Sequence, residues 1–449
     1  MSSEDFVFAL REYKVVSKWV NSPGGDDRNA SRFMNEIVPI DARTFKIRWN
    51  QPYAGASAVA FQPLPRHILE PLLEGGDQDK YLNSPHWSIA YVGAGPYRLT
   101  KWERNAFMDG AAFEGFALGR PKIDRIVLTF SDRPPVTVAH LLSGELDMAV
   151  DRSIEFQEIR ALREEWVART QAKLLLSPIT LRYLQIQQRP QYADPEVLLD
   201  LRTRQALVHA IDRAGLAEAM VEDRSMAADT MLPRNISYYA DIDRVATKYP
   251  FDPRRTEQLM SEMGYAKGPD GLFISATARR YSQELGGLSE GQEAQDTTIV
   301  ADFLKRAGFD TSLNLIPAAL RDGPQADEMS ATFPALNTNN NSLTPPLLGM
   351  HKWVAANIGT AENRWRGTNK MGWATPGYER LFEAFNGTLN LREASRHMVQ
   401  MVKIFNDELP AIPLYFNFSV MAHVGSLQGP EPATPSGTIY YNLHQWEWR

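Results

Sequence analysis

Helical and strand patterns alternate along this chain without a strict βαβ rhythm, and this mixture constrains its fold more than any other feature. Residues 44–49 (TFKIRW) alternate apolar and polar positions, as a half-buried strand does. Residues 202–213 (RTRQALVHAIDR) instead repeat apolar positions at helical spacing, behind Asp200 as a suitable N-cap. The mixture predicts an α/β protein with mixed sheets. Helices are expected at 202–222, 253–263, 298–307 and 391–409.

The composition excludes several classes of function. Hydrophobic residues make up 43% and charged residues 23%, as in globular proteins, and 449 residues exceed one ordinary core, so two or three domains are expected. The net charge is −6 and no run rich in Lys and Arg occurs, so no nucleic acid partner is expected. Without cysteine, thiolate catalysis, disulfides and Cys-based metal sites are excluded. The eight histidines lack metal-ligand spacing, so no metal and no cofactor is expected.

No catalytic or targeting motif stands out in the sequence. A GxSxG elbow and a P-loop are missing, and GAGPYR at 93–98 departs from the dinucleotide-binding pattern at its sixth position. No apolar run approaches the roughly 20 residues that span a bilayer, and the start, MSSEDFVFALREY, lacks the regions of a signal peptide. A hydrolase acting on peptides or glycosides through a convergent site stays open as an alternative, because sequence spacing does not exclude it.

Four phrases together resemble one protein family. They are GAGPYRLTKWE (93–103), LLSGELD (141–147), RTRQALVHAIDR (202–213) and YPFDPRRTEQLMSEMGY (249–265). They occur in the order expected of the peptide/nickel-type substrate-binding proteins of ABC transporters, solute-binding protein family 5. The closing YYNLHQWEW (440–448) also resembles the last strand of that family.

The resemblance implies a bilobed, periplasmic-binding-protein-like fold (type II, cluster C) with an inter-lobe cleft and no enzymatic activity. Such a protein captures a small peptide or a related polar solute by closure of its lobes and delivers it to ABC permease subunits in the membrane. The resemblance also implies a monomer in the periplasm or at the cell surface. The implied divisions are 1–92 (remainder of a small extra lobe), 93–200 (lobe I), 201–424 (lobe II) and 425–449 (return to lobe I).

The start of the chain departs from the family. Members begin with a signal sequence, a first strand and further residues ahead of a phrase like SSEDFVFALREY, which here forms the amino terminus. A sheet without its first strand exposes backbone donors and acceptors at its edge. We therefore hypothesise that Met1 is not the natural start, with a truncated non-functional remnant as a further alternative.

The expected ligand region also departs from the family. Peptide binders carry a tryptophan and an aspartate in the segment matching Thr332–Thr338, and the aspartate pairs with the peptide ammonium. Here Asn337 stands at the best-matching position, within 337–341 (NTNNN). An amide has no net charge, so a free peptide amino terminus is less favoured than in the family. Residues 321–350, rich in Pro, Gly, Asn and Thr, are expected to form a long structured loop.

Eight residues are candidates for ligand binding. The amides belong to the asparagine run or follow an apolar strand near the expected lobe crossing, and the tryptophans lie in the irregular region. Solvated turn residues, outward-facing strand residues and core packing are the competing interpretations. The candidates are Asn337, Asn339, Asn340, Gln185, Gln187, Trp353, Trp365 and Trp373.

Overall fold

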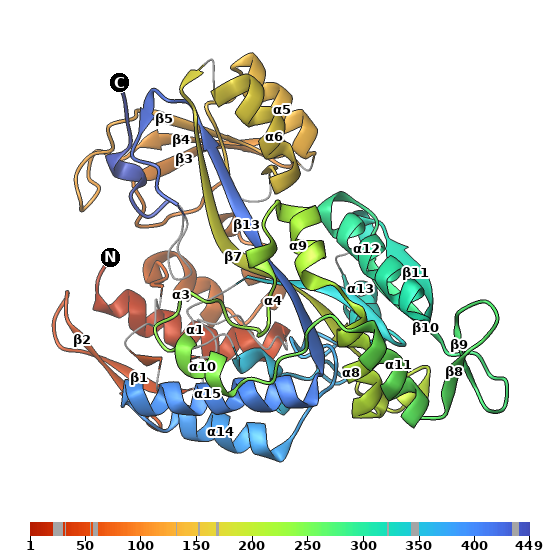
Figure 1. Ribbon diagram of the computed structural model, residues 1–449. Helices are drawn as coiled ribbons and strands as arrows, with labels where there is room; N and C mark the ends of the chain where they lie inside the picture. The colour runs from red at the N-terminus through yellow and green to blue at the C-terminus, as the bar shows by residue number, and fades with distance from the viewer. Residues whose placement is uncertain are drawn as a thin grey trace. The chain divides into compact units, whose positions relative to one another are not determined.

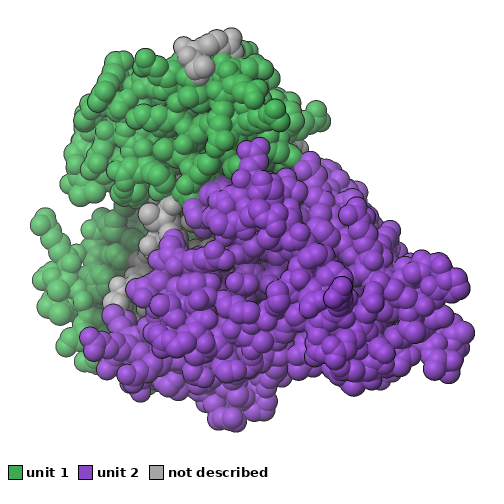
Figure 2. All heavy atoms as spheres, in the orientation of Figure 1, with its two compact units in different colours: residues 1–177, 419–449 green, residues 178–418 purple. Residues whose placement is uncertain are grey.

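The computed structural model divides the chain into two compact units, coloured separately in Figure 2. Unit 1 contains residues 1–177 and 419–449, and unit 2 contains residues 178–418. The chain passes between them within β7 (Lys173–Ile186) and within β13 (Ala411–His423). The expected division into lobes stays a prediction. The structure describes residues 1–20, 30–31, 33–53, 55–56, 62–131, 133–150, 153–167, 170–320, 323–342, 350–432 and 440–449.

The first part of unit 1 combines helices with a hairpin that lies beside α1 (Figure 1). α1 (Ser3–Val20) has acidic residues in its first turn and a lysine in its last, which suits the helix dipole. It contacts β1 (Met34–Pro39), which pairs antiparallel with β2 (Phe45–Trp49). α3 (Arg66–Glu74) and α4 (Gln78–Leu82) follow. The two buried clusters are Leu10, Ala30, Met34, Ile37 and Tyr53, and Phe8, Leu69, Leu73 and Tyr81.

The second part of unit 1 contains an antiparallel sheet of β3 (Tyr97–Glu103), β4 (Phe107–Ala112) and β5 (Arg125–Thr129). α5 (Pro134–Ser143) follows it and ends at Gly144, whose φ of 80° is left-handed. The remaining elements are short: β6 (Met148–Ala149), α6 (Ile159–Ala161), a π-helical turn (Leu162–Val167), β14 (Leu427–Gln428) and β15 (Glu447–Trp448). The closing phrase thus forms a 3-10 turn at Leu443–Gln445 and only two strand residues.

A mixed sheet forms the centre of unit 2. Its strand order is β11-β10-β12-β7-β13-β6, in which β6 and the end of β13 belong to unit 1. β10 (Ser282–Leu288) pairs parallel with β11 (Asp310–Ile316) and with β12 (Leu336–Ser342), whereas β12 pairs antiparallel with β7. The predicted α/β class with mixed sheets is therefore confirmed.

Helices of unit 2 begin and end at residues with clear local causes. Asp200 caps α8 (Leu201–Ala210) by accepting a hydrogen bond from the Arg202 N–H, as predicted. The expected single helix over 202–222 is wrong, because Asp212 caps a separate helix, α9 (Arg213–Val221). The other helices are α10 (Tyr239–Val245), α11 (Pro253–Glu262), α12 (Gly291–Ala307), α13 (Pro324–Thr332), α14 (Pro376–Asn386) and α15 (Leu391–Glu408). The small hairpin is β8 (Tyr265–Lys267) with β9 (Phe273–Ser275).

The expected loop over 321–350 is wrong where the structure describes it. α13 occupies its first part, and the asparagine run lies in β12, while residues 321–322 and 343–349 lie outside the described residues. Asparagine disfavours strands on its own. Here β12 is hydrogen-bonded to strands on both sides, so tertiary pairing overrides the local preference. Among the described helices, none has the length and apolarity needed to cross a membrane.

Candidate functional site

A pocket of about 280 Å³ with both polar and apolar lining residues lies within unit 2. It is bordered by the carboxyl ends of the parallel strands β10 and β11, by β12, by the first turn of α12 and by α13. The carboxyl ends of parallel strands are the usual place for ligands in open α/β sheets. The polar and glycine residues that line it are Glu284, Gly286, Gly287, Glu293, Asn314, Ser330, Thr332, Asn337, Thr338 and Asn339.

Two adjacent glycines allow the walls of this pocket to approach one another. A Cβ atom at Gly286 would lie 2.7 Å from Oδ1 of Asn337. A Cβ atom at Gly287 would lie 2.7 Å from the hydroxyl oxygens of Thr297 and Thr338, which contact each other at 2.6 Å. Because real Cβ contacts are longer than this, a side chain at either position would force these asparagine and threonine side chains to move from their present contacts.

Two of the predicted amides, Asn337 and Asn339, line the pocket, and a third, Gln185, contacts both of them from the neighbouring strand β7. The side-chain amides of Asn337 and Asn339 both donate to Oε1 of Gln185, at 3.3 Å each, and Gln185 lies opposite Asn337 in the β7–β12 register. Gln185 is fully buried. It therefore holds both asparagine side chains through their N–H groups, at the position where they line the pocket. Groups held in this way are suited to hydrogen bonding with a ligand that exposes peptide-like groups.

A carboxylate is held at the same place by a buried ion pair. Glu293, in the first turn of α12, accepts a hydrogen bond from the amide of Asn340, the fourth predicted residue here. Its Oε1 also lies 3.2 Å from Nη1 of Arg182. Arg182 is buried and donates from Nε and Nη2 to Asp296, at 2.6 and 2.9 Å. Burial is the largest single effect and lowers the pKa of Arg182, but the charge of Asp296, its hydrogen bonds and the charge of Glu293 together raise this pKa above its ordinary value, so the guanidinium stays charged.

Two further contacts complete the polar surroundings. The hydroxyl of Tyr415 donates to Oδ2 of Asp296 at 3.0 Å, and burial followed by the nearby Asp296 charge holds the pKa of Tyr415 well above its ordinary value. The tyrosine therefore remains a hydrogen-bond donor. Glu284 accepts from the Asn314 amide at 2.9 Å, which links β10 to β11 beside the pocket.

Gln187 and the tryptophans do not line this pocket. The amide of Gln187 donates to the carbonyl of Phe333 at 2.7 Å and so anchors the segment after α13. Trp353 is 1% exposed and Trp373 is 4% exposed, and both rings contact Phe405 in the core. Trp365 has a left-handed φ of 60°, and its carbonyl accepts from Lys370. A ligand contact for these four residues stays a prediction.

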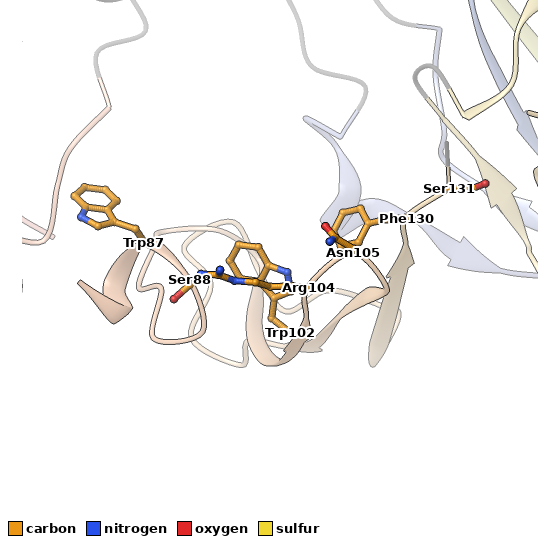
Figure 3. A pocket seen from close by; sticks show the side chains of 7 residues that line it. All are labelled: Trp87, Ser88, Trp102, Arg104, Asn105, Phe130 and Ser131. Carbon is orange, nitrogen blue, oxygen red and sulfur yellow. The ribbon is translucent and has the colours of Figure 1, made fainter. Parts of the chain in front are cut away.

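A second hollow, of about 720 Å³, lies within unit 1 (Figure 3). Its wall includes Trp87, Trp102, Arg104 and Phe130, which the sequence reasoning did not single out. In Figure 3 the Trp87 ring lies apart from the side chains of Trp102 and Arg104. The hollow therefore offers aromatic rings together with the polar side chains of Ser88, Arg104, Asn105 and Ser131. Among the described residues, no group of three or more His, Asp or Glu side chains could hold a metal ion.

Comparison with known proteins places the chain among binding proteins. A sequence profile of the bacterial extracellular solute-binding proteins, family 5 middle, matches residues 1–353. A putative ABC transporter peptide-binding protein of Brucella ovis is 21% identical over 82% of this chain and 65% of its own length. The dipeptide-binding protein of Escherichia coli is 21% identical over 74% of this chain and 63% of its own length. The chain thus spans less than two thirds of the length of these relatives.

Solved structures show the same fold. NikZ of Campylobacter jejuni, in complex with Ni(L-His), matches 99% of this chain and 84% of its own, with a TM-score of 0.80 and 19% identity. The oligopeptide-binding protein AppA of Bacillus subtilis, with a nonapeptide, matches 100% of this chain and 84% of its own, with a TM-score of 0.74 and 14% identity. The expected fold of the periplasmic-binding-protein type is confirmed.

Proposed function

Because the chain belongs to the bacterial extracellular solute-binding proteins of family 5, we propose that it is the substrate-binding component of an ABC importer for peptides or related polar solutes. The observation that carries this proposal is that Asn337 and Asn339 line one pocket and are both held there by Gln185. Amides present both donors and acceptors, which match the carbonyl and N–H groups of an extended peptide. Affinity comes from these hydrogen bonds and from expelled water.

The mechanism is non-covalent capture. The chain passes between its two units within β7 and within β13. Two connecting segments suit a hinge, because few backbone dihedral angles have to change when the units move. Ligand binding favours a closed state, which docks on the permease subunits of the importer. The protein works outside the cytoplasm as a monomer, and it releases its ligand unchanged.

The ligand side of the proposal is tested with protein purified from its own host. Native mass spectrometry of this protein should show a co-purified peptide or polar solute, and a peptide library incubated with it should be retained and recovered intact. Cleaved library members would support the hydrolase alternative instead. A broad, non-cooperative thermal melt together with no retention would support the non-functional remnant.

A variant pair locates the binding to the pocket. Replacing Asn339 by alanine removes one amide that lines the pocket and should weaken retention about two- to tenfold, since one hydrogen bond contributes about 0.5–1.5 kcal/mol. Gln258→Ala is the matched control, because it removes an exposed amide that contacts only Glu262 on α11. Equal retention by both variants would place the ligand elsewhere.

A further inference from the structure

The pocket of unit 2 carries an uncompensated negative charge. Of the described residues that line it, the charged ones are Glu284 and Glu293. The guanidinium of Arg182 lies 3.2 Å from Glu293 and also donates two hydrogen bonds to Asp296, so its single positive charge is shared between two carboxylates. The amino-terminal end of α12 contributes about half a positive charge. This is smaller than the two negative charges of the carboxylates, so the net charge at the pocket is negative.

The structure holds Glu293 at the pocket in a defined place. Both of its contacts, with Arg182 and with Asn340, fall on Oε1, while its side chain remains 21% exposed. Nη1 of Arg182 is buried and makes no hydrogen bond to the described residues. The ion pair with Glu293 is therefore the polar contact of this nitrogen. Glu293 is thus oriented by the buried Arg182 and the half-buried Asn340, and it lines the pocket.

We propose that this pocket selects a ligand with a cationic group, an ammonium or a guanidinium, and that Glu293 is the carboxylate that faces it. The inference rests on the proposed function and adds the charge class of the ligand. A positive charge on the ligand is attracted by the negative charges of Glu293 and Glu284, and binding removes water from it. A ligand carboxylate at the same place is repelled by them. The counter-charge thus comes from the first turn of α12 rather than from the asparagine run of β12.

The test uses ligand-free protein and tripeptide pools. The middle residue of each pool is lysine or arginine, norleucine, or glutamate, and each pool is prepared with free and with acetylated amino ends. Retention by the native protein should be highest for the lysine and arginine pool and at least tenfold lower for the glutamate pool. Loss of retention on acetylation of the norleucine pool would assign the cation to the peptide amino terminus rather than to a side chain.

Three variants connect the preference to Glu293. Glu293→Gln keeps the shape and the acceptor for Asn340, and it should reduce the preference for the cationic pool at least tenfold. Glu293→Lys should reverse the preference toward the glutamate pool. Asp302→Asn is the matched control, because it removes an exposed carboxylate of the same helix that pairs only with Arg306 at 2.7 Å. A cooperative thermal melt of each variant confirms that it folds.

The outcomes separate this inference from the proposed function. Equal retention of all pools, or a preference that survives in Glu293→Gln, would overturn the inference and leave the proposed function standing. Retention of no pool would overturn the peptide part of the proposed function. In that case agmatine and glutarate serve as small probes in a thermal-shift assay: a rise with agmatine that Glu293→Gln abolishes supports the charge class, and no rise overturns it.

Discussion

Replacing Asp296 by asparagine should destabilise unit 2 by about 3–5 kcal/mol. Asp296 is fully buried, and its partner Arg182 is 2% exposed. The substitution keeps the size of the side chain and removes its charge. A buried guanidinium then remains without its counter-ion, and this is the costly arrangement for an interior charge.

The structure shows where this magnitude comes from. Asp296 accepts from Nε of Arg182 at 2.6 Å, from Nη2 at 2.9 Å and from the Tyr415 hydroxyl at 3.0 Å. In the variant, one of the two oxygens becomes an N–H donor that faces another donor. At least one charge-assisted hydrogen bond is lost, at about 1.5–3 kcal/mol, and the unpaired charge accounts for the rest. Glu293 compensates only in part, because it contacts one nitrogen of Arg182 at 3.2 Å.

Urea unfolding followed by fluorescence and circular dichroism measures the loss. Because the chain has two units, each transition is fitted separately. Asp302→Asn is the control and should cost about 0.3–0.5 kcal/mol, as an exposed helix pair does. The double variant Arg182→Met/Asp296→Leu should recover most of the stability. A loss below about 1 kcal/mol for Asp296→Asn, or one equal to the control, would refute the reasoning.

Three further predictions follow from single positions. Trp353→Ala should cost about 3–5 kcal/mol in urea unfolding, because the ring is 1% exposed in the core; weaker peptide retention at unchanged stability would instead assign it to the ligand. Gly287→Ala should lower the melting temperature and peptide affinity together, since its Cβ would lie 2.7 Å from two threonine hydroxyls; an unchanged melt contradicts this. Burial lowers the pKa of His423, so the unfolded chain takes up a proton near pH 6.5 that the folded state takes up only at lower pH. The stability of unit 1 should therefore fall as the pH drops below about 6.5, and His423→Gln should reduce this fall in the urea midpoint; an unaltered fall would contradict it.

Helix ends show what short-range chemistry can predict. The sequence places the end of one helix at Gly264, and the structure gives this residue a left-handed φ of 82° after α11. α15 likewise matches its predicted range of 391–409 within one residue. By contrast, α12 begins at Gly291, whereas the predicted helix begins at 298. The N-cap of α12 is Glu290, which makes no capping hydrogen bond with its side chain, so the sequence has no capping residue that indicates the start. The residues of its first turns, including Glu293, were therefore missed.

The candidate site likewise contains residues that the sequence predicted and contacts that only the structure shows. Gln185, Asn337, Asn339 and Asn340 could be named from the sequence, because amides that interrupt apolar patterns are visible there. The sequence did not show that Gln185 contacts both Asn337 and Asn339, or that Glu293 contacts Asn340. The only sequence signal for that part is the pair of glycines at the end of β10, which precedes the acidic first turn of α12.

The sequence by itself determined the family, the α/β class and most helix ends, because these depend on phrases and caps within a few residues. Only the tertiary structure decided that the asparagine run is a strand and that it borders a pocket with Glu293. The reason is the distance along the chain: Asn337 and Gln185 lie 152 residues apart, and their contact exists only once β7 and β12 have paired. The low strand preference of the asparagines is overcome by hydrogen bonds to neighbouring strands, and the sequence around them does not indicate these bonds.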